Sequence, residues 1–173
     1  MIIRINKSEL AFLNKLLDEC DLSSLVGEDK NIVNELKHKL KNDLPRLFID
    51  GAADLHSKRA GIGGVFLKDE QEIMSFSENI GSATNNEAEY QALIKGLKLA
   101  VKNEILSLQI FADSELVVKQ INGVYKVKNE RMQILHSEAK LLLIKFDSWE
   151  INHVRREKNK IADNYAKRGM MQS

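Results

Sequence analysis

The 173-residue sequence contains one cysteine, Cys20, and one proline, Pro45. A single cysteine excludes an intramolecular disulfide, and no group of cysteine and histidine residues has the spacing of a zinc site. The cysteine count therefore favours a reducing compartment. We expect a cytoplasmic protein.

The chain also lacks a long hydrophobic run and an excess of one charge. No segment approaches the roughly 20 apolar residues that a membrane-spanning helix needs, so we expect no membrane partner. The net charge of +1 gives no overall field that would attract a polyanion, so any nucleic-acid site must be a local patch. The most basic segment lies near the C-terminal end and contains Arg155, Arg156, Lys158, Lys160, Lys167 and Arg168.

The first 45 residues differ in pattern from the rest. Apolar residues recur there at helical spacing in two stripes, Leu10, Leu13 and Leu17, then Val33, Leu36 and Leu40. A turn near Gly27 separates the stripes, which predicts a helical hairpin over residues 1–45. Because the hairpin is too small to hold a core of its own, we expect it to pack on the main domain, on a second copy in a homodimer, or on a protein partner.

Residues 46–173 are expected to form one α/β domain. Short segments rich in strand formers predict three consecutive strands in a meander, at 46–53, 62–68 and 72–80. The rest predicts helices at 85–102, 115–121, 129–146 and 159–169, with strands at 106–112 and 149–154. This order is typical of a mixed sheet covered by helices.

Four acidic residues fall where an unpaired charge is expensive. Asp50 and Asp113 each follow an apolar run, so we expect both at the C-terminal tips of buried strands, where ligands bind in α/β sheets. Glu89 shares a predicted helix face with apolar residues that must meet the sheet, and Asp163 stands between two alanines that let the last helix approach closely. A carboxylate on such a surface costs several kcal/mol unless it is paired or binds a metal.

Each acid also has a simpler explanation. Asp50 could form a turn, Asp113 could start a helix, Glu89 could belong to a capping box, and Asp163 could be a first-turn acid favoured by the helix dipole. Four such coincidences are harder to accept than one shared site, yet converging carboxylates would repel each other. Hard divalent cations would relieve that repulsion, and two of them about 3.5–4 Å apart can promote phosphodiester hydrolysis.

The motifs that contain these acids resemble, in order and approximate spacing, those of type 1 ribonucleases H. They are Phe48-Ile49-Asp50-Gly51-Ala52, Thr84-Asn85-Asn86-Glu87-Ala88-Glu89-Tyr90, Phe111-Ala112-Asp113-Ser114 and Asn159-Lys160-Ile161-Ala162-Asp163. The similarity is closest to the compact bacterial and archaeal branch and covers residues 46–169. It implies the ribonuclease H-like fold, an α/β mixed five-stranded sheet of three antiparallel and two parallel strands flanked by helices.

The resemblance also implies an activity for the domain at 46–173. Members cleave the RNA strand of RNA/DNA hybrids endonucleolytically, leaving a 5′-phosphate and a 3′-hydroxyl. Asp50, Glu89, Asp113 and Asp163 would be the catalytic ligands of two Mg²⁺ or Mn²⁺ ions, with Asp50 bridging both. Glu87 would then be an exposed neighbour of Glu89.

A set of substrate contacts follows from the same resemblance: Gly51, Thr84, Asn85, Asn86, Lys126 and Lys128. Amide and hydroxyl groups can bond phosphates and RNA 2′-hydroxyls, although Thr84 or Asn85 could equally cap a helix. Lys126 and Lys128 stand in a short segment where some relatives carry a long basic insertion. Hybrid binding is therefore expected to be weak and salt-sensitive unless the hairpin helps.

Proton transfer and two rival functions remain open. Many relatives carry a mobile histidine before the last aspartate, but His153 is expected to lie inside a strand as a structural residue, so Glu157 or a water could take that role. Another polynucleotide hydrolase on the same fold should lack the segment 84–86. A non-catalytic hybrid-binding or scaffold module should lack the intact acidic quartet.

Overall fold

The computed structural model describes residues 44–54 and 56–172, together with positions 13, 15–17, 19, 27, 29 and 31–33. The chain divides into two compact units, Met1–Leu44 and Pro45–Ser173. The described positions before Leu44 are helical, apart from Gly27, which lies in a turn with a φ of 67°. The rest of the predicted hairpin lies outside the described residues, so its structure and its partners stay predictions. Within the described part of the chain, no helix is long and apolar enough to cross a membrane.

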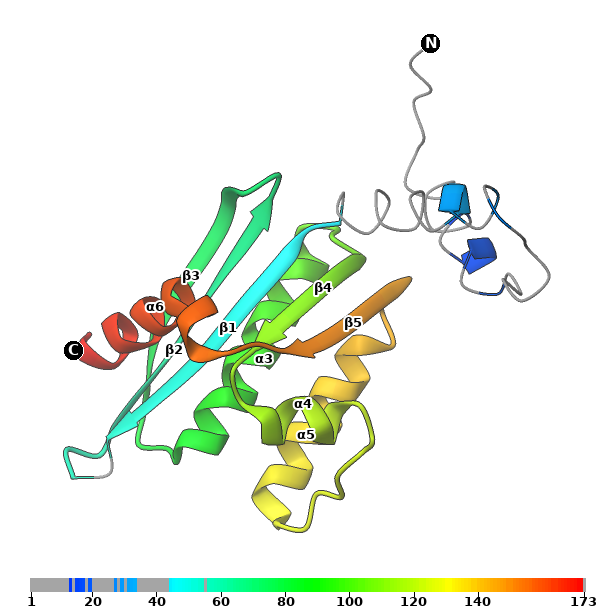
Figure 1. Ribbon diagram of the computed structural model, residues 1–173. Helices are drawn as coiled ribbons and strands as arrows, with labels where there is room; N and C mark the ends of the chain where they lie inside the picture. Colours follow the sequence, from blue (N-terminus) through cyan, green and yellow to red (C-terminus); the bar gives the residue numbers. More distant parts are fainter. Residues whose placement is uncertain are drawn as a thin grey trace. The chain divides into compact units, whose positions relative to one another are not determined.

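The second unit is built on a five-stranded sheet of order β3-β2-β1-β4-β5 (Figure 1). Strands β1 (Arg46–Asp54), β2 (Arg59–Lys68) and β3 (Gln71–Gly81) form an antiparallel meander. Strands β4 (Ser107–Ala112) and β5 (Ser148–His153) extend the sheet in parallel with β1. The predicted mixed sheet of three antiparallel and two parallel strands is confirmed.

Helices cover both faces of this sheet (Figure 1). Helix α3 (Asn85–Lys102) packs against β1 and β2 on one face, and α5 (Glu130–Leu143) packs against α3. The short α4 (Glu115–Ile121) lies against β4 and β5. On the other face, α6 (Lys160–Met171) crosses β1, β2 and β3 after a single 3₁₀ turn, η2 (Arg156–Lys158).

Most bounds lie within two residues of the sequence prediction, and three differences are larger. Strand β2 begins at Arg59, three residues early, because the glycines that weaken its strand signal pack beneath α6. Helix α5 ends at Leu143 and not at 146, and the turn η2 was not predicted. None of these differences changes the order of the elements.

The main hydrophobic core lies between the sheet and α3. Leu47 and Ile49 of β1 and Leu93 and Leu97 of α3 are fully buried, each stabilising the fold by about 1.5–3 kcal/mol. The helix face predicted from the neighbours of Glu89 is confirmed, since α3 buries Ala92, Leu93, Gly96, Leu97 and Ala100.

Small residues bring α6 close to the opposite face. A Cβ added at Gly61 would lie 2.1 Å from the Met170 nitrogen, and one added at Gly63 would lie 2.1 Å from the Ala166 nitrogen. At the start of the helix, the buried Asn159 amide donates a 2.9 Å hydrogen bond to the Ile49 carbonyl of β1. The final helix therefore packs as closely as its alanines predicted.

Candidate active site

Asp50 and Asp113 lie where strands β1 and β4 stop pairing. The last parallel pair is Ile49 with Ala112, so each aspartate is the next residue on its strand. The expectation that Asp50 ends a strand is wrong, because β1 continues to Asp54 in antiparallel pairing with β2. Strand β4 ends one residue before the position opposite Asp50. The edge of β1 that faces β4 is therefore unpaired at Asp50.

Asp113 directly follows the last residue of β4, as expected for a strand tip, but it does not start the following helix. Ser114 is the N-cap of α4, and its hydroxyl accepts a hydrogen bond from the Val117 amide. The simpler explanation of Asp113 as the helix-entry residue is therefore wrong. The carboxyl group of Asp113 does not cap the helix and lines the acid pocket instead.

Glu89 reaches the same place from α3 because Gly51 has no side chain. A Cβ at Gly51 would lie 2.3 Å from the Glu89 nitrogen, so the helix backbone rests directly on β1. A backbone hydrogen bond from Gly51 then reaches the Glu89 carboxyl group. The close contact explains how a residue in the second turn of α3 arrives beside Asp50.

The capping box of α3 consists of Thr84 and Glu87, not Glu89. The Thr84 amide and hydroxyl both donate to Glu87 Oε2 at 2.8 Å, and the Glu87 amide donates back to the Thr84 hydroxyl at 3.3 Å. The simpler explanation of Glu89 as a capping partner is therefore wrong. The expected exposure of Glu87 is also wrong, since its side chain is only 16% exposed.

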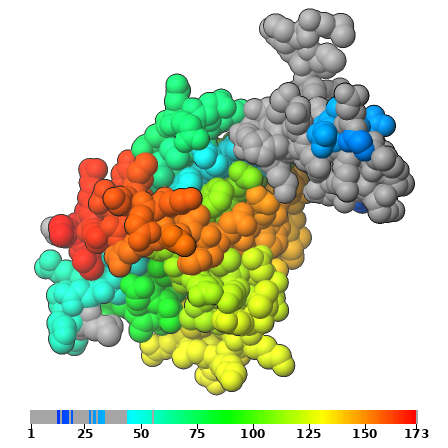
Figure 2. Space-filling view, in the orientation of Figure 1, coloured from blue at the N-terminus to red at the C-terminus, as the bar shows by residue number. Residues whose placement is uncertain are grey.

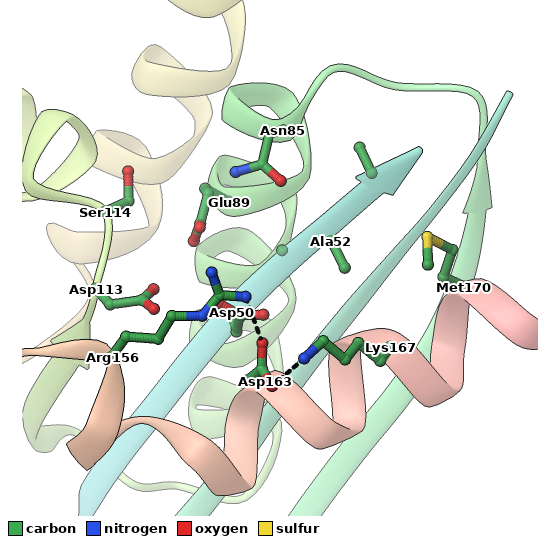
Figure 3. Close-up of a pocket in the computed structure, with 12 residues that line it drawn as sticks. Asp50, Ala52, Asn85, Glu89, Asp113, Ser114, Arg156, Asp163, Lys167 and Met170 are labelled. Atoms are coloured by element: carbon green, nitrogen blue, oxygen red, sulfur yellow. Dashed lines mark hydrogen bonds and ion pairs between the residues drawn. The ribbon is translucent and has the colours of Figure 1, made fainter. Parts of the chain in front are cut away.

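Asp50, Glu89 and Asp113 form a tight cluster. One carboxylate oxygen of each lies within 4.8 Å of the others, and Asp50 and Glu89 are only 5% and 4% exposed. Figure 3 shows Glu89 and Asp113 pointing toward Asp50. Glu89 Oε2 is buried and has no hydrogen-bond partner among the described residues. Such an oxygen is available to a bound cation.

Burial and neighbouring charge disfavour ionisation of this cluster. Burial, followed by the charge and hydrogen bond of Asp113, raises the pKa of Asp50 to about 8. Burial, followed by the charges of Asp50 and Asp113, raises the pKa of Glu89 to about 9. The carboxylates can be fully ionised at neutral pH only if positive charge is supplied among them. Hard divalent cations with oxygen ligands meet that requirement.

Asp163 lies at the same pocket but is paired with two cations. Its Oδ1 accepts from an Arg156 nitrogen at 3.0 Å, and its Oδ2 accepts from Lys167 Nζ at 2.6 Å. Burial alone would raise its pKa, but the bonds from Lys167 and Arg156 hold the pKa of Asp163 below its ordinary value. Asp163 also stands in the first turn of α6, so the simpler explanation of this residue agrees with its position.

The four acids line one pocket of about 480 Å³. Its other lining residues are Gly51, Ala52, Ala53, Asn85, Ser114, Arg156, Lys167 and Met170. The structure thus brings together side chains separated by more than a hundred positions, as Asp50 and Asp163 are. Sequence reasoning missed Arg156 and Lys167 as members of this site. The i,i+4 spacing of Asp163 and Lys167 was the available signal for the second.

The predicted substrate contacts are spread over three places. Gly51 and Asn85 line the acid pocket. Thr84 and Asn86 line another pocket, of about 330 Å³, and Thr84 also caps α3 as its simpler explanation proposed. Lys126 lines a third pocket together with Tyr125 and His136, and Lys128 is exposed. The structure therefore gathers two of the six at the acids.

The two candidates for proton transfer do not line the acid pocket. His153 is the last residue of β5 and pairs in register with Ala112, so it lies in a strand as expected. Its side chain is exposed and is not packed into the core. Glu157 is an exposed residue of η2.

Known proteins resemble this chain in sequence. A family model described as reverse transcriptase-like matches residues 48–169. Ribonuclease HI of Halobacterium salinarum is 35% identical over 117 residues, which are 67% of this chain and 59% of that relative. The bifunctional protein Rv2228c of Mycobacterium tuberculosis is 37% identical over 123 residues, which are 70% of this chain and 34% of that relative. The chain thus matches less than two thirds of the length of each of these two relatives.

The fold agrees with a solved structure of the same kind. The structure of LC11-RNase H1 in complex with RNA/DNA hybrid superposes with a TM-score of 0.68 at 31% identity, covering 73% of this chain and 96% of that chain. The family match extends over all four acids of the pocket, from Asp50 to Asp163. The chain therefore belongs to the reverse transcriptase-like family and, within it, to the type 1 ribonucleases H.

Proposed function

We propose that this chain is an endonuclease that hydrolyses the RNA strand of RNA/DNA hybrids. The observation that carries the proposal is the cluster of Asp50, Glu89 and Asp113, whose carboxylate oxygens lie within 4.8 Å of one another in a buried setting. Two relatives support the substrate, because one is named ribonuclease HI and another was solved with an RNA/DNA hybrid.

The donor set fits Mg²⁺ or Mn²⁺. The four acids offer only carboxylate oxygens, the hard ligands that these ions prefer, and Glu89 Oε2 lacks another partner among the described residues. Asp50, Glu89 and Asp113 would hold one ion, and Asp50 and Asp163 would hold the second. When bound, such a pair of ions supplies activation of the attacking water and stabilisation of the leaving oxygen.

The chain's own residues orient the substrate and shield the site. The low exposure of Asp50 and Glu89 keeps bulk water from these carboxylates, which strengthens every electrostatic interaction in the pocket. Asn85 is exposed at the same pocket, where its amide can bond a phosphate or an RNA 2′-hydroxyl. Contact with a 2′-hydroxyl would distinguish the RNA strand from DNA. Hydrolysis breaks the bond from phosphorus to the 3′-oxygen, leaving a 3′-hydroxyl and a 5′-phosphate.

A cleavage assay on matched duplexes tests the proposal. Labelled RNA/DNA hybrid, double-stranded RNA and double-stranded DNA of one sequence are incubated with the protein in Mg²⁺, Mn²⁺ or EDTA. Asp113→Asn serves as the inactive control, because it removes one carboxylate of the cluster at constant volume. We expect cleavage of the hybrid that requires metal and leaves 5′-phosphate ends.

The other outcomes identify the rivals. Preferential cleavage of double-stranded DNA would favour another polynucleotide hydrolase on this fold. Binding of the hybrid without metal-dependent cleavage of any duplex would favour a non-catalytic hybrid-binding module. Either result would overturn the proposed function.

A further inference from the structure

The charge of Arg156 acts on every acid of the pocket. The guanidinium donates to Asp163 Oδ1 at 3.0 Å and interacts electrostatically with Asp50, Glu89 and Asp113. Figure 3 shows it lying over Asp50, between Asp113 and Asp163. Arg156 therefore places positive charge in the region where a cation bound by these carboxylates would lie.

This arginine is loosely held. It belongs to the one-turn η2, which has no side-chain cap and lies on the molecular surface beside α6 (Figure 2, orange next to red). Its side chain is 73% exposed although its partner Asp163 is only 12% exposed, so water can reach the guanidinium and compete for its bond to the carboxylate. The guanidinium can leave the pocket without disturbing the core.

Lys167 provides a useful contrast within the same pocket. Its Nζ bonds the other oxygen of Asp163 from the next turn of α6, at i,i+4 spacing. Arg156 is among the strongest influences on the pKa of Asp50 and of Glu89, whereas Lys167 is among the strongest influences on the pKa of Asp163. Lys167 thus positions Asp163, and Arg156 neutralises the pocket as a whole.

We propose that Arg156 is a built-in counter-cation that competes with divalent metal ions for the acid pocket. The inference rests on the proposed function, because it assumes that the four acids bind metal. Arg156 occupies Asp163 Oδ1, an oxygen of a proposed metal ligand, so the guanidinium must release this oxygen before a metal ion can bind it. A phosphate of bound nucleic acid offers the guanidinium another partner, which couples full metal loading to the presence of substrate.

Mn²⁺ titration of the full chain without nucleic acid, followed by calorimetry, tests this competition. We expect Arg156→Gln to bind Mn²⁺ about three- to tenfold more tightly than the wild type, since it removes the competing charge. Arg156→Lys keeps a charge and should stay within about twofold of the wild type. Arg155→Gln removes the same charge from the exposed neighbouring residue, and it should also stay within about twofold.

A thermal readout separates competition from a merely structural role. Without metal at pH 8, Arg156→Gln should melt below the wild type because the acids lose their counter-charge, and saturating Mn²⁺ should remove the difference. Unchanged or weaker Mn²⁺ binding by Arg156→Gln would overturn the inference, as would an equal gain in Arg155→Gln. Failure of the wild type to bind Mn²⁺, together with no hybrid cleavage, would instead overturn the proposed function.

Discussion

Asp50 and Asp113 occupy equivalent positions on neighbouring parallel strands, one residue beyond the last register pair, and their carboxyl groups are hydrogen-bonded to each other. Two carboxyl groups can form such a bond only by sharing a proton. In the metal-free protein, burial and Asp113 therefore raise the pKa of Asp50 and favour a proton among oxygens that suit a divalent cation. Protons and metal ions compete for these oxygens, and the first prediction follows from that competition.

The metal-free protein should lose stability as the pH rises. The pKa values of Asp50 and Glu89, about 8 and about 9, lie above the ordinary values of 3.8 and 4.5 that apply to the unfolded chain. The folded protein therefore binds more protons than the unfolded chain between about pH 4 and pH 9, and linkage makes the free energy of unfolding fall across that window. Denaturant titrations in EDTA at pH 5, 7 and 9 should show a decrease on the order of a few kcal/mol.

Metal should reverse this pH dependence. Saturating Mg²⁺ at pH 9 should restore the free energy of unfolding, because bound cations favour the ionised carboxylates that high pH produces. A free energy of unfolding that stays level from pH 5 to pH 9 in EDTA would contradict the raised pKa values of Asp50 and Glu89.

Asp50→Asn should abolish cleavage and yet stabilise the metal-free protein. The amide keeps the volume of the carboxyl group but removes a buried charge that Asp113 and Asp163 repel. At pH 8 in EDTA we expect a higher melting temperature, by about 2–4 °C for each kcal/mol of repulsion relieved. Scanning calorimetry measures the change.

The matched control is Asp69→Asn in the turn between β2 and β3. Asp69 is exposed and has a φ of 51°, which asparagine also tolerates, so the same substitution should leave the melting temperature unchanged. A melting temperature of Asp50→Asn that is equal to or lower than that of the wild type would show that the acids do not repel one another.

Gly51→Ala should be far more damaging than Gly96→Ala. Both glycines lie in the contact of β1 with α3, but the new Cβ at Gly51 would meet helix backbone at 2.3 Å, whereas at Gly96 it would meet the flexible end of Leu47 at 2.6 Å. We expect Gly51→Ala to lower the free energy of unfolding by several kcal/mol and to displace Glu89. At Gly96 the gain in helix propensity of about 1 kcal/mol offsets part of the cost.

Urea denaturation of the two variants gives the difference directly, and Mn²⁺ titration shows whether Glu89 has moved. Equal losses of stability, or a normal Mn²⁺ affinity in Gly51→Ala, would contradict the role assigned to the missing side chain at Gly51.

We expect Thr84 to act as a structural residue and Asn85 to bind the substrate. Thr84→Ala removes the cap of α3 and should lower the free energy of unfolding by about 1 kcal/mol, while Thr84→Ser keeps the hydroxyl and should not. Asn85→Ala should leave stability within about 0.5 kcal/mol, because its side chain is exposed, but should raise the KM for hybrid. A raised KM in Thr84→Ala with unchanged stability would reverse the assignment.

The sequence could predict Asp50 and Glu89 because each conflicts with its apolar neighbours. An acidic residue within an apolar pattern can be recognised from its own segment, without knowledge of the contacts that the segment makes. The order of the elements was likewise readable from periodicity, since strands β1–β3 and helix α3 carry clear patterns.

The remaining features depend on contacts between segments far apart in the chain. The continuation of β1 beyond Asp50 is set by pairing with β2, and the position of Arg156 over the acids is set by η2, a turn without a pattern of its own. The glycines of β2 weaken its strand signal, yet they are what allows α6 to bring Asp163 to the pocket. Such features follow from packing, which local propensity does not encode.

Deletion of residues 1–44 should leave the domain at 45–173 folded and able to cleave hybrid. The chain divides at Leu44 and Pro45, and the four acids and the buried core residues Leu47 and Leu143 belong to the second unit. Cooperative urea unfolding of the truncated chain, with a free energy within about 1 kcal/mol of the full chain, would meet the expectation. A truncated chain that fails to fold would show that the predicted hairpin belongs to the core.

A truncated chain that folds and binds Mn²⁺ normally but has a much higher KM for hybrid would show that the hairpin contributes to substrate binding. Comparison of the oligomeric states of the full and truncated chains tests the predicted homodimer.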